Sequence, residues 1–258
     1  MTASLYCWSG LQKVNLLFFI DNAPWFMEPI TRHVPTWLGP ILDASCYALP
    51  AVEIFVGIGT LLQRVRRAAL LVGLLMHLFI LYAIGPLGHD VNTVVWPWNV
   101  TMMGLLWVLF GQADQVPIRP LWSYRPALLG RFAIVGAFAI LPAMNFLGLW
   151  NLNLSWGLYS EMFLEVDVNI DETAMPCLPP EVRQHVKATK DGNVLSIFEW
   201  AVDVLNVPPW PAPWVFHRLR DQLCRCDPHG ELISFDIWEP VRWQLPIPFK
   251  KRRCGETW

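Results

Sequence analysis

The chain has 258 residues, of which 54% are hydrophobic and 16% charged, and its mean hydropathy is +0.36. Because charged residues make up about 25% of an ordinary soluble domain, this composition excludes that class and favours a membrane protein. The net charge of −2, without a broad basic field, excludes a nucleic-acid-binding protein.

The N-terminal region predicts a short or partial helix at 1–11, where Gln12 and Lys13 interrupt the apolar run, followed by an aromatic, interfacial segment at 14–30. A run of about 20 apolar residues can cross a bilayer. Four such runs follow, at about 41–63, 68–86, 92–111 and 130–150. We therefore expect residues 1–150 to form an all-α polytopic membrane helix bundle with four full spans.

Small residues and prolines mark the expected spans. Gly57 and Gly59 in the first full span should let neighbouring helix backbones approach closely. Pro50 and Pro142 lie inside spans and should kink them. Pro97 should break the third span or delay its start.

Residues 151–258 are much more polar and predict a small extramembrane α+β domain. They hold 15 of the 21 acidic and 11 of the 19 basic residues. Apolar and polar residues alternate at 163–170 and 231–238, which predicts strands. Helical spacing at 196–205 and 215–224 predicts two helices, and 178–186 a short one that starts at proline. The other expectations are a turn at 191–193, an extended VPPWPAPW segment at 207–214 and an irregular basic end at 248–254.

Basic residues in short loops predict the orientation. Three arginines at 64–67 and further ones at 119, 125 and 131 should face the cytoplasm, whereas the opposite loops offer only Arg32. Tryptophan prefers the membrane interface, and six gather at the expected outer ends, at 25, 37, 96, 98, 150 and 156. We therefore expect a multi-pass protein of the bacterial inner (plasma) membrane, with its C-terminal domain on the outer (periplasmic) side.

Glu53 and His77 are the candidate catalytic residues. Glu53 lies 12 residues before Val65 and His77 lies 12 after it, so antiparallel spans would hold both about 18 Å from the turn. Ionisable groups inside a membrane are costly and often functional. The pair could form a proton or quinone site. In the structural alternative, Glu53 hydrogen-bonds a neighbouring helix and His77 a backbone carbonyl.

The segment at 89–99 and Lys13 are the candidate cofactor-binding groups. Trp96, Trp98 and Asn99 could stack on and hydrogen-bond a flat ring. Alternatively, the tryptophans anchor the protein at the interface and the asparagines cap the helix start. Lys13 could extend to the interface or pair with Glu53. We expect no metal site.

Four of the six cysteines lie in the tail, at 177, 224, 226 and 254. On an oxidising face they could form two disulfides. Free thiols, or a metal site with His217 or His229, are the alternatives. Cys224 and Cys226 are too close for an easy mutual bridge, and the absence of a CxxC motif counts against a thiol oxidoreductase.

Several motifs resemble the DoxX/MauE-type small membrane proteins. They are WSGLQK at 8–13, PAVE at 50–53, the glycines at 57 and 59, and the arginine-rich turn. The chain more closely resembles a bacterial branch with a GPLG motif (85–88), a VVWPWN signature (94–99) and a soluble C-terminal tail with LYS (158–160) and LNVPP (205–209).

The resemblance implies a four-helix core and membership of redox-associated membrane complexes. Relatives of this type include the small subunit of thiosulfate:quinone oxidoreductase and a maturation factor for methylamine dehydrogenase. It also implies that Lys13 and Glu53 occupy family positions, and it leaves quinone as the one cofactor to consider.

Two functions therefore stand side by side. In the first, the chain is an accessory subunit of a quinone-linked membrane redox system, in contact with the lipid bilayer and with other membrane or periplasmic subunits. In the second, it is a scaffolding protein that docks a partner through its outer C-terminal domain. A small transporter is a third alternative, disfavoured because no inverted repeat is visible.

Overall fold

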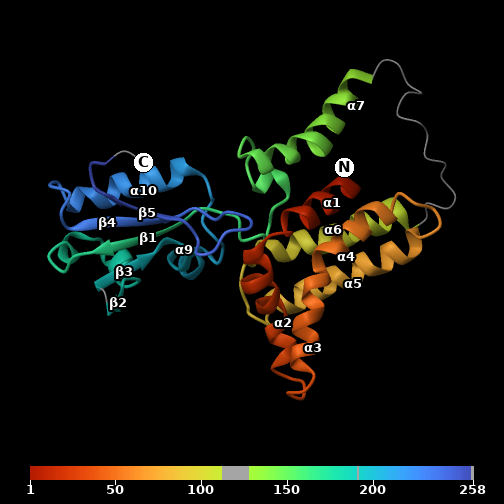
Figure 1. Ribbon diagram of the computed structural model, residues 1–258, viewed down its shortest axis with the longest axis horizontal. Coiled ribbons are helices and arrows are strands. Elements are labelled where there is room, and N and C mark those ends of the chain that lie inside the picture. Colours follow the sequence, from red (N-terminus) through yellow and green to blue (C-terminus); the bar gives the residue numbers. More distant parts are fainter. Residues whose placement is uncertain (112–127, 191, 257–258) are drawn as a thin grey trace. The chain divides into compact units, whose positions relative to one another are not determined.

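The computed structural model describes residues 1–111, 128–190 and 192–256 of the chain (Figure 1). The chain divides into two compact units, Met1–Glu161 and Met162–Trp258. In its described part the first unit is built of helices, whereas the second combines a β-sheet with helices (Figure 1).

The first unit begins with a succession of short helical segments. α1 is followed by a π-helical turn (η1) that leads into α2, and a 3-10 turn (η2) separates α3 from α4. In chain order the segments are α1 (Thr2–Gln12), η1 (Phe18–Asn22), α2 (Ala23–Thr31), α3 (Gly39–Ser45), η2 (Cys46–Ala48) and α4 (Leu49–Gly59). The 3-10 turn η2 directly precedes α4, in which Pro50 lies in the first turn.

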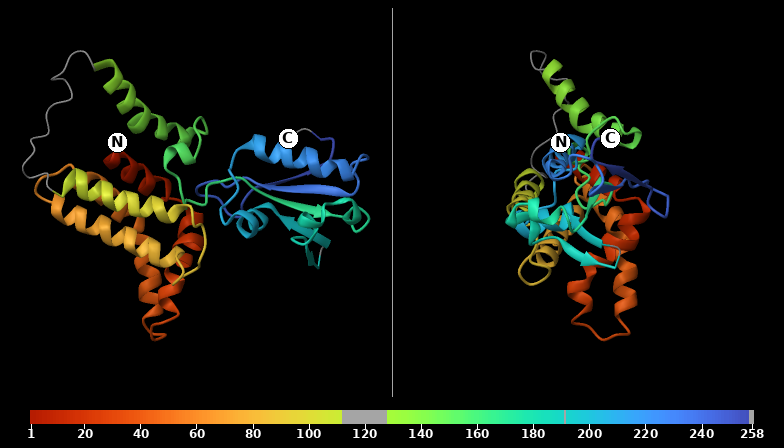
Figure 2. Two further views of the ribbon diagram at one scale, coloured as in Figure 1. Left: turned by 180° about the vertical axis from the view of Figure 1, so that it is seen from behind. Right: turned by 90° about the vertical axis from the view of Figure 1, so that its left-hand side faces the viewer.

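Longer helices follow, and α5 and α6 lie side by side (Figure 2). A further helical stretch, from α7 through η5 and η6, changes its winding twice. The segments are α5 (Arg66–Ile84), α6 (Val95–Phe110), α7 (Leu128–Val135), the π-helical η5 (Gly136–Ile140), and the 3-10 helices η6 (Leu141–Leu147) and η7 (Asn153–Ser155).

The prediction of an all-α bundle with four full spans is wrong. Across the described residues, two helices are long and apolar enough to cross a membrane, Gly39–Gly59 with 21 residues and Arg66–Ile84 with 19. The five-stranded sheet makes the chain as a whole a mixed α/β structure. The other two apolar runs, Val95–Phe110 and Phe132–Leu147, form shorter helices.

The backbone of these two runs explains why their helices are shorter than a full span. α6 starts only at Val95 and has 16 residues, which extend about 24 Å against a hydrocarbon core of about 30 Å. Pro97 is accommodated in its first turn, where no backbone N–H is needed. In the last run, a proline at 142 starts the 3-10 segment, and Gly148 ends it in the left-handed conformation, with φ +70°.

Two glycines let α1 and α4 pack with their backbones in close contact. A Cβ on Gly10 would lie 2.5 Å from the carbonyl oxygen of Pro50, and one on Gly57 would lie 2.7 Å from that of Ala3. A Cβ on Gly59 would similarly lie 2.7 Å from the Cβ of Ala69 on α5. The close approach predicted for the glycines at 57 and 59 is confirmed.

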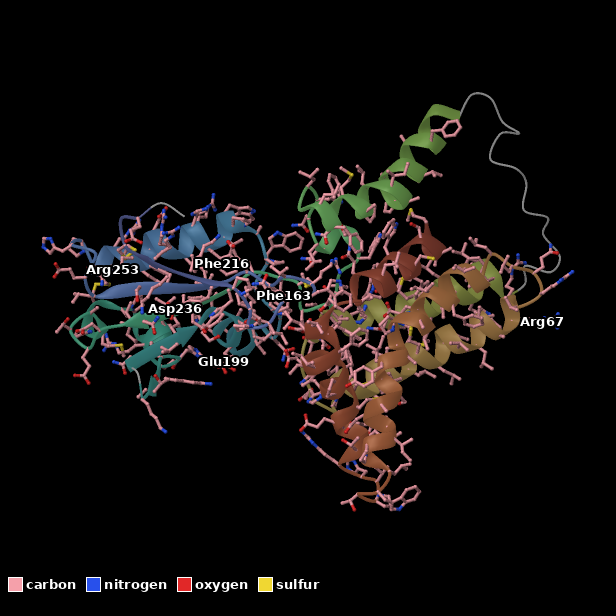
Figure 3. The ribbon with its side chains drawn as sticks, in the orientation of Figure 1. Arg67, Phe163, Glu199, Phe216, Asp236 and Arg253 are labelled. Atoms are coloured by element: carbon pink, nitrogen blue, oxygen red, sulfur yellow. A yellow bond between two sulfur atoms is a disulfide. The ribbon has the colours of Figure 1, made fainter. Side chains whose placement is uncertain are left out.

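The arginine-rich turn between α4 and α5 is only partly a solvated loop. Arg64 and Arg67 are exposed, and Arg67 is labelled in Figure 3. Arg66, by contrast, is 2% exposed, and its Nε donates to the carbonyl oxygen of Thr60 at 2.9 Å, near the end of α4. The arginines predicted to mark the second cytoplasmic loop, at 119 and 125, lie outside the described residues.

The second unit contains an antiparallel sheet with the strand order β2-β3-β1-β4-β5. The strands are β1 (Glu165–Ile170), β2 (Lys187–Thr189), β3 (Gly192–Ser196), β4 (Ile233–Trp238) and β5 (Phe249–Arg253). In the register of the central strands, Asp167 faces Ser196 on one side and Asp236 on the other. The helices are α8 (Pro180–Arg183), α9 (Ile197–Leu205) and α10 (Pro213–Leu223), with the short 3-10 turns η8 (Met175–Cys177) and η9 (Cys224–Cys226).

The alternating pattern of the strands places one face of the sheet in a hydrophobic core. β1 buries its even-numbered residues and β4 its odd-numbered ones. Phe216 on α10, labelled in Figure 3, is 1% exposed and belongs to the same core as Val168 and Phe235. α10 therefore covers the apolar face of the sheet.

Two disulfides and a buried aspartate fix the turn after α10. The bridges are Cys177–Cys226 and Cys224–Cys254, so of the alternatives for these cysteines the structure has the disulfides. Asp227 is 2% exposed and accepts backbone hydrogen bonds from Glu231, Leu232 and Ile233 at 2.8–3.0 Å. Burial acts to raise the pKa of Asp227, but these N–H donors outweigh it and hold the pKa below its usual range.

The sequence predicted most elements of the second unit. β1, β4, α8, α9 and α10 confirm the strands and helices expected there. The hairpin of β2 and β3 was not predicted. The basic end was expected to be irregular, and this was wrong, because Phe249–Arg253 pairs with β4 as the edge strand β5. Residue 191 of the expected turn lies outside the described residues.

Candidate functional site

A cavity of about 80 Å³ lies inside the first unit, among α1, α4, α5, α6 and the segment after η7. Seven side chains with a hydroxyl, amine, carboxylate, imidazole or amide group line it, those of Tyr6, Ser9, Lys13, Glu53, His77, Asn99 and Tyr159. The rest of the wall is aliphatic and aromatic.

A buried ion pair forms one part of the wall. The Nζ atom of Lys13 lies 3.1 Å from each carboxylate oxygen of Glu53, and the two side chains are 7% and 9% exposed. Lys13 also donates to the hydroxyl of Ser9 at 2.8 Å. Lys13 caps the C-terminus of α1, where the helix dipole favours a cation. The close contact of α1 with α4 at Gly10 brings the two charges together.

A chain of hydrogen bonds between side chains forms a second part of the wall. The hydroxyl of Tyr6 lies 2.6 Å from Nε2 of His77, and Nδ1 of His77 lies 2.7 Å from Oδ1 of Asn99. The amide nitrogen of Asn99 donates to the carbonyl oxygen of Val95 at 2.9 Å, so its oxygen faces the ring. In a neutral imidazole, this geometry assigns the ring proton to Nδ1 and makes Nε2 the acceptor for the Tyr6 hydroxyl.

Aromatic rings enclose the remaining wall. Trp98 stacks on Trp156, with ring centroids 6.5 Å apart, and Trp156 also stacks on Phe138 at 6.0 Å. The hydroxyl of Tyr159 accepts a hydrogen bond from Asn92 at 2.8 Å. Trp156 and Tyr159 come from the irregular segment after η7, where both residues have positive φ.

The structure gathers most of the residues that the sequence singled out. Lys13, Glu53, His77, Trp98 and Asn99 all line the cavity. Glu53 and His77 have different partners, since Glu53 pairs with Lys13 and His77 bonds side chains rather than the backbone carbonyl of the structural alternative. Of the two alternatives for Lys13, the ion pair is therefore the one present.

The other predicted groups lie elsewhere or act differently. Trp96 is not part of the lining; its indole N–H donates to the carbonyl oxygen of Val91 at 3.1 Å. The asparagines do not cap the start of α6, because Asn92 bonds Tyr159 and no side chain caps that helix. Within residues 1–111, 128–190 and 192–256, no group of three or more His, Cys, Asp or Glu side chains could hold a metal ion.

Among the lining residues whose side chains can form hydrogen bonds, four were missed by the sequence reasoning. Tyr6 and Ser9 carried a usable signal, because Tyr6, Ser9 and Lys13 recur at spacings of three and four and so share one face of α1. Trp156 and Tyr159 carried no such signal, since they lie outside any regular helix or strand.

The comparisons with known proteins add no relative to this picture. A scan against protein-family models, a search of curated proteins and a search of solved structures each found no match to the chain.

Proposed function

We propose that the chain is an integral membrane protein that binds a small ring compound of the quinone type in the cavity of its first unit, as an accessory subunit of a quinone-linked redox system. The observation that carries this proposal is the composition of the cavity wall. It combines a buried Lys13–Glu53 ion pair and the Tyr6–His77–Asn99 chain with stacked aromatic rings. The resemblance to DoxX/MauE-type proteins points in the same direction.

Exposed apolar side chains support a membrane setting. Leu71, Leu75 and Leu78 of α5 are 53–57% exposed and recur every three or four residues, so they form an apolar stripe on one helix face. Val100 and Val108 of α6 are similarly exposed. A soluble monomer rarely exposes large apolar patches, whereas lipid would cover them.

The disulfides support an outer location for the second unit. Cys177–Cys226 and Cys224–Cys254 would persist in an oxidising compartment and be reduced in the cytosol. This agrees with the proposed orientation, in which the second unit lies on the periplasmic side of a bacterial inner membrane and the exposed Arg64 and Arg67 lie on the cytoplasmic side.

The polar groups of the cavity suit a ring that carries oxygen atoms. A quinone has two carbonyl acceptors, and its reduced form has two hydroxyl donors. Lys13 is a donor, and Glu53 retains acceptor capacity beyond its bonds to Lys13. The Tyr6 hydroxyl, whose proton goes to His77, can still accept a hydrogen bond at its oxygen. The aromatic and aliphatic remainder of the wall matches the ring itself.

Binding of duroquinone, a tetramethyl-benzoquinone with one ring, tests the proposal. Isothermal titration calorimetry on the full chain in detergent should give saturable binding to the wild type. Glu53→Gln removes the carboxylate that would accept a hydrogen bond from a hydroxyl of the reduced form, duroquinol, and the loss of one hydrogen bond to a charged group corresponds to roughly 10- to 100-fold weaker binding of duroquinol.

The matched control is Glu199→Gln. Glu199 forms an exposed ion pair with Lys187 of 2.7 Å in the second unit, so this change should leave binding unaltered. Circular dichroism of both variants verifies that they are folded. Absence of saturable duroquinone binding to the wild type, or equal affinity of Glu53→Gln and the wild type for duroquinol, would refute the proposal.

A second candidate function is the docking of a partner subunit through the second unit. The segment at 207–214 is rich in proline, and it exposes Trp210 by 47% and Trp214 by 57%. The guanidinium of Arg218 lies 5.5 Å from the ring centroid of Trp214. Tryptophan and arginine are enriched at protein interfaces. Co-purification of a membrane subunit with the wild type, but not with Trp210→Ala/Trp214→Ala, would support docking; identical co-purification would refute it.

A further inference from the structure

Trp156 presents a hydrogen-bond donor that the described part of the protein leaves unused. The residue lines the cavity, and its indole N–H is buried without an acceptor among the described residues. The indole N–H of Trp150, which does not line the cavity, is also buried without an acceptor in the described ranges, whereas two other tryptophans of this unit do have acceptors. The indole N–H of Trp8 donates to the carbonyl oxygen of Ala139 at 3.2 Å, and that of Trp96 donates to the carbonyl oxygen of Val91 at 3.1 Å. Buried polar groups in proteins are nearly always paired, so an unpaired one calls for an explanation.

The ring of Trp156 is held in a fixed orientation. It stacks on Trp98 and on Phe138, with interplanar angles of 17° and 21°. A ring held by two stacking partners loses little further freedom when a ligand binds. The donor is therefore preorganised.

The backbone around Trp156 is also anchored. The N–H of Gly157 donates to the carbonyl oxygen of Leu152 at 3.0 Å, and the hydroxyl of Ser160 donates to the carbonyl oxygen of Gly157 at 2.7 Å. Asn15, just beyond α1, donates to the carbonyl oxygen of Ser160 at 2.8 Å. This segment is thus tied to the end of the helix that supplies Lys13.

We propose that the indole N–H of Trp156 donates a hydrogen bond to a carbonyl oxygen of the ring ligand, and that this bond makes the cavity select a quinone over a hydrocarbon ring of the same shape. The inference rests on the proposed function and deepens it. It assigns Trp156 as a specificity-determining residue, and it assigns to the ligand an acceptor atom on its ring. Trp98 and Phe138 hold the indole in place.

The test compares two ligands of the same shape. Duroquinone and durene carry the same tetramethyl-substituted six-membered ring, but only duroquinone has carbonyl oxygens. Trp156→Phe keeps an aromatic ring and removes the N–H. Calorimetry on the full chain in detergent should show roughly tenfold weaker binding of duroquinone, the worth of about one hydrogen bond, and less than a twofold change for durene. Trp96→Phe, the matched control, removes an indole N–H outside the cavity lining and should leave both affinities unchanged.

The outcomes separate this inference from the function on which it rests. If duroquinone binds the wild type but Trp156→Phe binds it equally well, the inference is overturned and the proposed function stands. If durene binds the wild type as tightly as duroquinone, the selectivity is absent and the inference is overturned without any variant. If duroquinone does not bind the wild type, both fail. Should Trp156→Phe not fold, Trp156→His, which retains a ring N–H, is expected to keep the preference for duroquinone, and loss of that preference overturns the inference.

Discussion

Replacement of Gly57 by alanine should separate the two helices that hold the ion pair. The new Cβ would lie 2.5 Å from Sγ of Cys7, 2.7 Å from the carbonyl oxygen of Ala3 and 2.9 Å from the backbone nitrogen of Cys7. The last two contacts are with backbone atoms of α1, which cannot rotate away as a side chain can. α1 must therefore shift relative to α4.

The size of the effect follows from these distances. Carbon atoms make favourable contacts at about 3.5–4.0 Å, so relief of the overlap requires a movement of about 0.5–1 Å. A gap of this size forfeits roughly a quarter to a half of the dispersion energy of each contact along the helix pair. Overpacking of this kind costs about 1–3 kcal/mol. For a unit of this length the melting temperature should fall by roughly 2–12 °C.

Thermal denaturation of Gly57→Ala in detergent, followed by circular dichroism, measures this loss. The control is Gly104→Ala on α6, where a Cβ would meet nothing within 4 Å. Since alanine favours a helix over glycine by about 1 kcal/mol, this control should melt at the wild-type temperature or slightly above it. If Gly57→Ala has the same melting temperature as Gly104→Ala, the close approach of α1 and α4 does not limit stability, and the reasoning is refuted.

Three further predictions concern charges and cross-links. Lys13→Met should lower the free energy of unfolding by about 3–5 kcal/mol, because it leaves the Glu53 carboxylate buried and unpaired. The double variant Lys13→Met/Glu53→Gln should recover most of this free energy, and a double-mutant cycle by thermal denaturation tests both expectations. Asp227→Asn should lower the free energy of unfolding by about 1.5–3 kcal/mol at pH 7, because it removes the charge that accepts the backbone hydrogen bonds. Folding lowers the pKa of Asp227, so the stabilisation by its carboxylate is complete above the unfolded pKa of about 3.9 and disappears as the pH falls through the folded pKa. The melting temperatures of Asp227→Asn and the wild type should therefore converge in acid. A difference in melting temperature that stays constant with pH would contradict this. Replacement of Cys224 and Cys254 by alanine opens a loop of 30 residues and should cost about 3.5 kcal/mol in chain entropy, and an unchanged urea midpoint would contradict this.

The strands and helices of the second unit were largely predictable because their patterns are local. β1 and β4 alternate buried and partly exposed residues, and α9 begins at a serine whose hydroxyl accepts a hydrogen bond from the N–H of Glu199. β5 could not be predicted in the same way. Its sequence, FKKRR, has no apolar alternation, and it becomes a strand because β4 offers it a pairing edge.

The first unit shows the limit of counting apolar residues. The runs at 41–63 and 68–86 became helices of spanning length, but those at 92–111 and 130–150 did not. Hydropathy sums over a window and does not register where a helix starts or how it winds. Pro142 and Gly148 decide the last run through backbone geometry rather than polarity.

The candidate site was predictable in its members but not in their pairing. Glu53 and His77 stood out because charged or ionisable groups are rare in apolar runs. Equal depth does not establish that two side chains face each other, since that depends on helix rotation. The rotation is set by packing at Gly10 and Gly57, which brings Lys13 to Glu53 and leaves His77 to Tyr6.

The position of β5 has a consequence for how the protein behaves at high concentration. An edge strand displays unpaired backbone groups that can recruit the sheet of another molecule and start a fibre. Four consecutive cations, from Lys250 to Arg253, occupy this strand. A second copy added at that edge would bring like charges together, so the mutual repulsion of these side chains protects the sheet against self-templated aggregation.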